Sequence, residues 1–183
     1  MSIKMTAVGL VLFCVSLHAQ ERDELRNHAW NVSVGGGKIG NSVGPRVRFG
    51  FNATRYFQPY VATYYSWHSE RTNGGTARVR EWMTGAGFDL KLQKKILGVT
   101  PLVWLEAGYR RGSINFSDPA GDVFRKRNSG LHLLPGIGIE KRIKHGFAFE
   151  GRVGRAMFAD RETSALLDIQ FFGNFAYHFG GRR

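Results

Sequence analysis

A strict alternation of apolar and polar side chains near the C-terminus is the feature that most constrains the fold. Between residues 166 and 179 the apolar series is Leu167, Ile169, Phe171, Phe175, Tyr177 and Phe179, broken only by Gly173, and the polar series is Asp168, Gln170, Asn174 and His178. Successive side chains of a strand point to opposite faces, so this pattern predicts one long strand and no helix. The strand exceeds the five or six residues usual in a soluble sheet, and its apolar face ends in aromatic residues, as expected of a strand that crosses an outer membrane.

Seven further segments alternate in the same way between turn-forming stretches. They cover residues 29–35, 45–54, 59–69, 77–92, 100–113, 129–143 and 147–158. In the segment 59–69, aromatic residues occur at both odd- and even-numbered positions, so the pattern does not determine which side faces the barrel interior. Eight strands suit a small closed barrel. Downstream of residue 19 no apolar run reaches the 18 or more residues of a membrane helix, so a membrane could be crossed only by strands.

The connections predict an up-and-down order of strands. Residues 36–44, 70–76, 114–128 and 159–165 fall at one end of the barrel, and the shorter connections 55–58, 93–99 and 144–146 fall at the other. In outer-membrane barrels the long loops face outward and the short turns face the periplasm. The predicted fold is therefore an all-β, eight-stranded antiparallel up-and-down transmembrane barrel.

The N-terminus has the pattern of a secretory signal. Lys4 supplies a positive charge, residues 7–15 form a short apolar run, and residues 16–20 offer small residues for cleavage. The run is too short for a membrane helix, which needs roughly 20 residues. We therefore expect residues 1–19 to be a cleaved signal peptide and residues 20–183 to form one barrel domain. An uncleaved anchor helix and lipidation of Cys14, the only cysteine, are the alternatives.

The charge balance is strongly basic. The chain has 26 Lys and Arg against 14 Asp and Glu, a net charge of +12. Such a balance favours anionic partners. Export argues against nucleic acid, and the chain has no basic helix, zinc-ligand set or nucleic-acid motif. Outer-membrane lipid, whose head groups carry phosphates, is the expected partner.

The polar parity of the strands carries charges of both signs among many glycines. Toward lipid, an arginine near the membrane midplane would cost about 2–4 kcal/mol, so this face is expected to point into the barrel. Buried charges need partners, so acids and bases of neighbouring strands should pair across a narrow interior. The predicted interior charge network is Arg46, Arg48, Glu81, Asp89, Glu106, Arg110, Glu140, Arg142, Glu150, Arg152 and Asp168.

A soluble exported barrel of the lipocalin type is the competing fold. Its apolar side would line a cavity and its charges would face water, and period-two alternation alone does not exclude this inversion. The long apolar series of the last strand argues against it, as do the aromatic residues at strand ends, which are Trp30, Tyr56, Phe57, Phe147, Tyr177 and Phe179.

Together these features resemble the small outer-membrane β-barrel proteins of Gram-negative bacteria, the OmpX/Ail-like and porin-family barrels. The resemblance covers the signal and residues 28–179 and depends on architecture and on the aromatic last strand. It implies that Phe175, Tyr177 and Phe179 form the assembly signal that the outer-membrane insertion machinery recognises. This chain departs from the pattern because residues 180–183 follow the final aromatic residue.

Catalysis would need a nucleophile and a base, because some barrels of this type resemble lipid A-modifying enzymes. Ser66, His68 and Glu70 share one face of the third segment and have the chemical types of a nucleophile, a base and an orienting acid. Same-face neighbours on a strand lie about 6.5–7 Å apart, beyond hydrogen-bond reach, so these three are more often ordinary rim residues. The histidines have no carboxylates at ligand spacing, so we expect no metal and no cofactor.

A basic cluster falls at the predicted outer end. Arg125, Lys126 and Arg127, with Arg71 and Arg111, would face the phosphates of lipopolysaccharide there. Lys38, Arg78, Arg80 and Arg110 fall near the same end and belong to the same cluster. The predicted function is a structural or surface-interaction role in the outer membrane, in which long loops, chiefly residues 112–128, contact lipopolysaccharide or an external partner. A lipid A-modifying acyl hydrolase and a small solute pore are the alternatives.

Overall fold

Long strands with alternating burial make up nearly all of the described chain. The computed structural model describes residues 29–39, 41–72, 74–92, 95–120, 122–158 and 169–180. The predicted signal peptide 1–19 lies outside these residues. No helix within the described ranges is long and apolar enough to cross a membrane, a finding that does not bear on strands.

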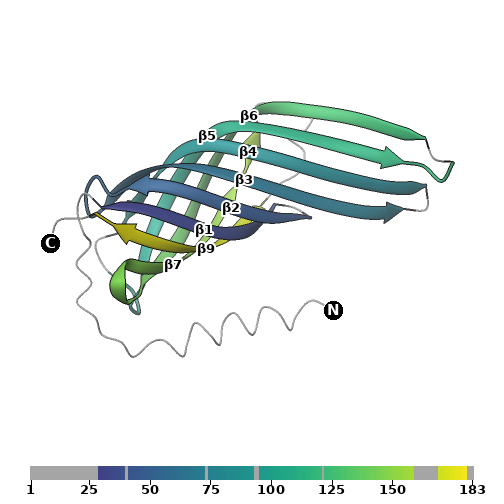
Figure 1. Cartoon of the computed structure of the whole chain (residues 1–183). Coiled ribbons are helices and arrows are strands. Elements are labelled where there is room, and N and C mark those ends of the chain that lie inside the picture. Colours follow the sequence, from purple (N-terminus) through teal and green to yellow (C-terminus); the bar gives the residue numbers. More distant parts are fainter. Residues whose placement is uncertain are drawn as a thin grey trace.

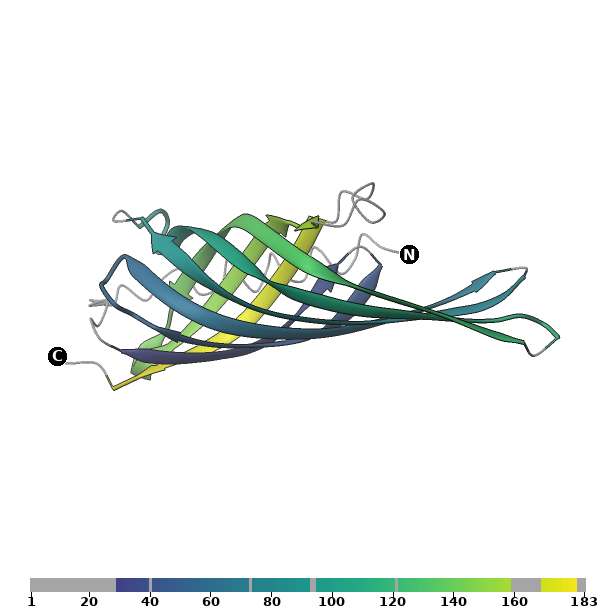
Figure 2. The same cartoon turned by 90° about the horizontal axis from the view of Figure 1, so that it is seen from above.

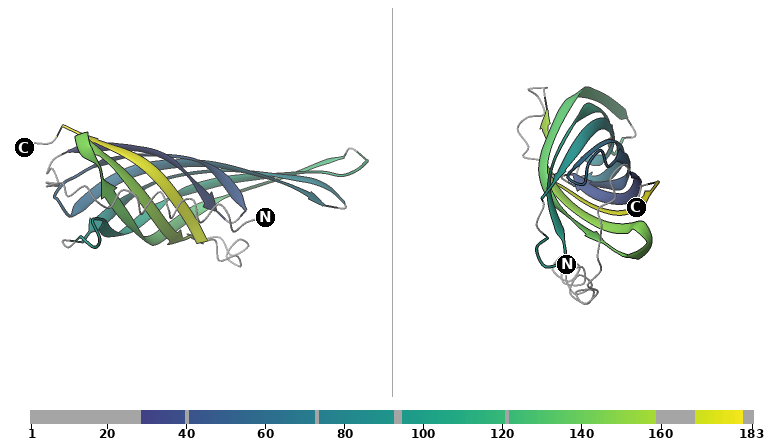
Figure 3. Two further views of the ribbon diagram at one scale, coloured as in Figure 1. Left: turned by 90° about the horizontal axis from the view of Figure 1, so that it is seen from below. Right: turned by 90° about the vertical axis from the view of Figure 1, so that its left-hand side faces the viewer.

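The strands close into an antiparallel barrel (Figure 1). They are β1 (Trp30–Ile39), β2 (Ser42–Phe51), β3 (Phe57–Thr72), β4 (Gly75–Lys91), β5 (Thr100–Ser117), β6 (Val123–Arg142), β7 (Phe147–Arg155), β8 (Met157–Phe158) and β9 (Ile169–Phe179). Each long strand pairs with the next, and β9 closes the barrel by pairing with both β1 and β7. The two-residue β8 continues the course of β7 along β6. The barrel therefore has eight strands, as predicted, and the end-on view in Figure 3 shows the closed wall.

Three of the predicted outer loops are wrong. Residues 36–39 and 42–44, 70–72 and 75–76, and 114–117 and 123–128 belong to strands. The fourth predicted outer loop, 159–165, lies outside the described residues. At the tip of one hairpin the backbone N–H of Asp122 donates to the carboxylate of Asp118 at 2.8 Å. The alternation of apolar and polar residues is weak in these stretches because they lie beyond the apolar band, where outward side chains do not contact lipid. The backbones of the strands remain paired there. The predicted loop 112–128 is a hairpin.

The extended strands form an arm beyond one end of the barrel. β3 has no partner on β2 after Trp67, and β6 has no partner on β8 before His132, in the described pairing. The four strands continue past these points as one sheet, which projects from the barrel in Figure 2. We call residues 68–72, 75–80, 112–117 and 123–131 the arm.

Within the barrel wall, burial alternates along the strands, and mostly polar residues occupy the buried side. In β9, Gln170, Asn174 and His178 are buried, whereas Phe171, Phe175 and Tyr177 are exposed. The same pattern settles the facing of β3, where the even-numbered residues from Gln58 to Ser66 point inward. The apolar side chains therefore cover the outside of the barrel, the reverse of a soluble barrel with an apolar cavity.

Candidate functional site: a charged lumen and an arginine-rich arm

The centre of the lumen holds a network of fully buried charges. The carboxylate of Asp89 accepts hydrogen bonds from Arg48 at 2.8 Å and from two nitrogens of Arg152 at 2.6 and 2.7 Å. Glu150 pairs with the same two arginines. These four residues come from β2, β4 and β7, so the network joins strands that are not neighbours in the barrel.

Further ion pairs extend the network toward both ends. Arg46 pairs with Glu106, and Arg110 pairs with Glu81 below the arm. Toward the opposite end, Glu140 accepts hydrogen bonds from Lys91 at 2.7 Å and from Arg142 at 2.8 Å. Lys91 is buried and was missed by the sequence analysis, although it has the same parity as Asp89. Of the predicted set, Asp168 lies outside the described residues.

This described network is nearly neutral. Its paired bases are six, Arg46, Arg48, Lys91, Arg110, Arg142 and Arg152, and its acids are five, Glu81, Asp89, Glu106, Glu140 and Glu150. The described network therefore accounts for only one positive charge of the chain's basic excess, +12.

An apolar cluster that the sequence analysis did not predict lies inside the barrel. Its buried side chains come from six strands and from Ala156, between β7 and β8, and Arg46 of β2 stacks on it, 4.1 Å from the ring centre of Phe172. We call this cluster the septum; its members are Ile39, Tyr64, Met83, Leu102, Trp104, Leu134, Ala156 and Phe172. The sequence analysis missed it because single apolar residues of inward parity are scattered among polar ones.

Two glycines make room for the largest side chain of the septum. An added Cβ at Gly136 would lie 2.5 Å from the Trp104 ring, and one at Gly154 would lie 2.7 Å from it. Gly136 is on β6 and Gly154 is on β7, and the indole ring of Trp104 packs against both strands. The indole nitrogen donates to the carbonyl of Ile137 at 3.1 Å, so the ring is fixed at its edge.

The outside of the barrel separates charge from apolar surface. Within the described ranges, no Asp or Glu occupies an outward-facing strand position; the strand carboxylates all have inward parity. In the described strands, outward cations lie on the arm and its base, as Arg80 does, or near the barrel ends, as Lys38 and Arg155 do toward the arm and Lys141 at the opposite end. Between these ends the exposed side chains are apolar or aromatic except for Thr63 and Thr84, whose hydroxyls donate to backbone carbonyls. Stacked aromatic pairs such as Phe147 with Phe175, at 5.2 Å, cover the end away from the arm.

The outward side of the arm and its base form an arginine face. Strand register aligns Trp67, Arg80, Ser113 and Arg127 in one row and Ser69, Arg78, Asn115 and Arg125 in the next. Rows lie about 7 Å apart along the strands, and alternate strands about 10 Å apart across them. The arginine face comprises Arg71, Arg78, Arg80, Arg111, Arg125 and Arg127, and no carboxylate of a described residue pairs with any of them.

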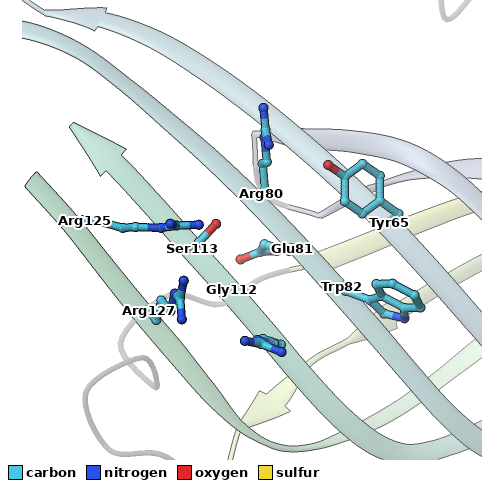
Figure 4. A pocket seen from close by; sticks show the side chains of 9 residues that line it. Tyr65, Arg80, Glu81, Trp82, Gly112, Ser113, Arg125 and Arg127 are labelled. Atoms are coloured by element: carbon cyan, nitrogen blue, oxygen red, sulfur yellow. The ribbon is translucent and has the colours of Figure 1, made fainter. Parts of the chain in front are cut away.

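A hollow of about 240 Å³ lies within the arginine face. Figure 4 shows Arg125 and Arg127 beside Ser113 on one side of it and Tyr65 and Trp82 on the other. Guanidinium groups, a hydroxyl and aromatic rings are the groups that bind phosphorylated or sulfated sugars through charge, hydrogen bonds and stacking.

The predicted lipid-phosphate residues separate onto two sides. Arg71, Arg111, Arg125 and Arg127 are exposed on the arginine face, whereas Lys126 has the opposite parity and lies on the inner side of the arm. Arg78 and Arg80, which the sequence analysis placed near the same end, belong to the arginine face, and register places them beside Asn115 and Ser113.

The candidate catalytic residues lie on one side of β3 at the base of the arm. Ser66 has no exposed surface, and the imidazole of His68 lies 3.7 Å from the carboxylate of Glu70. Phe175, Tyr177 and Phe179, the predicted assembly signal, are exposed on the outward side of β9. Among the described residues, no three His, Cys, Asp or Glu side chains form a group that could hold a metal ion.

Comparisons with known proteins show the class of fold. No protein-family model and no curated protein sequence matches the chain. Solved structures do match: a major outer membrane protein from Thermus thermophilus has a TM-score of 0.65 at 12% identity, covering 83% of this chain and 100% of that chain. Ail, the attachment invasion locus protein of Yersinia pestis, has a TM-score of 0.57 at 14% identity, covering 84% and 99%.

The N-terminal β-barrel domain of Pseudomonas aeruginosa OprF also matches, with a TM-score of 0.57 at 10% identity, covering 84% of this chain and 99% of that domain. The predicted resemblance is confirmed at the level of the fold. The chain has the closed eight-stranded antiparallel fold of the small outer-membrane β-barrel proteins.

Proposed function

We propose that the protein is a structural or surface-interaction barrel of the outer membrane, whose arm contacts lipopolysaccharide. The observation that carries the location is the outward surface, which is apolar between its ends and has no acidic residue in the described strands. An apolar band with flanking aromatic residues is stable in contact with a lipid bilayer and unfavourable in contact with water. The arm would then project from the outer leaflet, and the short turns would face the periplasm.

The arginine face supports contact with lipopolysaccharide. Its base lies beside Tyr65, Trp67 and Trp82, the aromatic residues that mark the edge of the apolar band, and this is the level of lipid head groups. Guanidinium groups bind phosphate oxygens bidentately. Ail has been crystallised with the heparin analogue sucrose octasulfate, so a barrel of this fold can hold a ligand with many oxyanions.

Export and assembly follow from the same proposal. Residues 1–19 would direct export and be cleaved, and the outward aromatic residues Phe175, Tyr177 and Phe179 of β9 would engage the insertion machinery. The septum favours a closed lumen over a solute pore, and the complete burial of Ser66 favours a non-enzymatic role.

The location is tested by cell fractionation with gel migration before and after boiling. We expect the full-length protein in the outer-membrane fraction, shortened by the signal, with a boiled form that migrates differently from the folded form. Recovery in the soluble periplasmic fraction would contradict the proposal.

The lipid contact is tested by exchanging Arg78, Arg80, Arg125 and Arg127 for glutamine together. We expect about a tenfold weaker affinity of the purified barrel for lipopolysaccharide micelles, because four charge-assisted contacts are lost in a partly screened setting. Lys126→Gln is the control for the side of the sheet, since it removes one cation from the inner side of β6, and the loss of affinity is compared per charge removed. Equal affinities for both variants would contradict a contact through the arginine face.

A further inference from the structure

The turn between β4 and β5, at the end of the barrel away from the arm, has a strained backbone. Ile96 and Val99 exchange two backbone hydrogen bonds, of 2.9 and 3.0 Å, so Leu97 and Gly98 are the two central residues of a tight turn. Both central residues have positive φ angles, 52° and 77°. Asparagine and glycine suit such a turn, whereas a leucine in the left-handed region is strained.

The same leucine is the most exposed large apolar side chain of the described residues. Leu97 is 82% exposed, and Leu92 and Ile96 beside it in the turn are exposed as well. Contact of these side chains with water is unfavourable. An asparagine at position 97 would relieve the strain and would suit water, so the residue present fits a turn that does not lie in water.

The apolar outer surface of the barrel continues onto this turn. Leu90 of β4 and Val103 of β5 pair in the barrel wall and are both exposed, and Leu92 follows with the same parity as Leu90. On the neighbouring strand, the backbone N–H of Ile143 donates to the carbonyl of Phe147 at 2.7 Å, so the exposed Ile143 lies beside one of the aromatic residues that cover this end. The turn is therefore continuous with the surface proposed to contact lipid.

Lysines border this apolar surface. Lys95 is exposed in the turn, and Lys141 lies on the outward side of β6, two residues before Ile143. Residues 90–105 and 141–149 contain no Asp or Glu. Apolar side chains with lysines at their margin fit a boundary between lipid and water, where the ammonium groups reach the lipid phosphates.

We propose that this turn and the end of β6 form a binding site for an anionic phospholipid of the inner leaflet. Leu92, Leu97 and Ile143 contact the acyl chains, and Lys95 and Lys141 bind the phosphate. The inference rests on the proposed location in the outer membrane and goes beyond it, because it concerns the leaflet and the barrel end opposite to the arm.

The position of the turn is tested with a nitroxide label in vesicles of phosphatidylethanolamine and phosphatidylglycerol. Cys14 is the only cysteine, so in the full chain with Cys14→Ser a label can be attached at one introduced cysteine. Ile96→Cys labels the turn, Ile137→Cys labels the outward side of the wall, and Ala120→Cys labels the tip of the arm.

We expect the labels at positions 96 and 137 to be more accessible to oxygen, which concentrates in lipid, than to a water-soluble nickel complex. The label at position 120 should show the reverse. Adding Leu97→Asn should shift the label at position 96 toward the nickel complex, although asparagine suits the turn, so this shift would not arise from a misfolded hairpin.

The head group is tested by native mass spectrometry of the unlabelled protein extracted from the same vesicles. The protein should retain phosphatidylglycerol in preference to phosphatidylethanolamine. Lys141→Gln should reduce this preference by about fivefold, because one contact between a lysine and a phosphate near the membrane surface is lost. Lys126→Gln is the matched control, since it removes one lysine from the inner side of the same strand, and it should leave the preference within about twofold. Heat-modifiable migration verifies that each variant is folded.

A label at position 96 as accessible to the nickel complex as the label at position 120 would overturn the inference and place the turn in the periplasm. The proposed location in the membrane would stand if the label at position 137 stayed in lipid, and it would fail as well if that label lay in water. Equal retention of the two lipids, or equal losses in Lys141→Gln and Lys126→Gln, would also overturn the site.

Discussion

Asp89 neutralises two arginines at the centre of the lumen, so its replacement by asparagine gives a sharp test of the charge network. The side chain has no exposed surface and accepts three hydrogen bonds, one from Arg48 and two from Arg152. In Asp89→Asn the shape is kept, but Glu150 alone remains to balance both guanidinium groups. Removing one partner from a buried ion pair costs about 3–5 kcal/mol.

The expected loss lowers the folding equilibrium constant by about a hundredfold to a few thousandfold. It is measured as the free energy of unfolding in urea, with the barrel in phospholipid vesicles and tryptophan fluorescence as the signal. Glu70→Gln is the control, because that carboxylate is 61% exposed and should change stability by less than about 0.5 kcal/mol. A loss below about 1 kcal/mol for Asp89→Asn would refute the reasoning, since it would mean that water screens the network.

Four further outcomes are expected. Trp104→Ala should lower the free energy of unfolding by about 3–5 kcal/mol, because it empties the septum, and an unchanged urea midpoint would contradict this. Gly154→Leu should cost about 1–3 kcal/mol in the same measurement by displacing the Trp104 ring, whereas Gly173→Ala, where an added Cβ meets nothing within 4 Å, should be nearly neutral; equal effects would argue against the close contact. Phe179→Ser should reduce the amount of heat-modifiable protein in the outer-membrane fraction, and wild-type levels would count against an assembly role. The unaltered protein should give no steps of conductance in planar bilayers, and regular steps would show that the septum does not close the lumen.

The sequence predicted the fold correctly in the barrel wall, where outward side chains are apolar and inward side chains are mostly polar. Alternation located all eight strands, and the inward side predicted for β4 and β6 is the one observed. It could not orient β3, because Tyr60 and Tyr64 fill the lumen while Tyr65 and Trp67 lie outside, and aromatic residues suit both environments. Only the three-dimensional closure of the barrel separates them.

The outer ends of the strands were mispredicted for a related reason. Around Arg78 and Arg125, apolar residues do not recur at every second position. The pattern that marks a membrane strand is therefore lost there, although the strands remain paired. The basic cluster was predicted, but its arrangement was not. Register across three strands, which the sequence does not state, brings Arg80 and Arg127 to either side of Ser113, whereas Lys126 lies on the inner side.

The septum has a consequence for how the barrel closes correctly. A slip of one strand by two residues preserves the order of inward and outward side chains, so alternation alone cannot oppose it. In a strand that contributes one side chain to the septum, the same slip would withdraw it, as for Phe172 of β9 or Tyr64 of β3, whose rings pack edge to face. The septum thereby penalises a two-residue slip of these strands, which alternation alone does not.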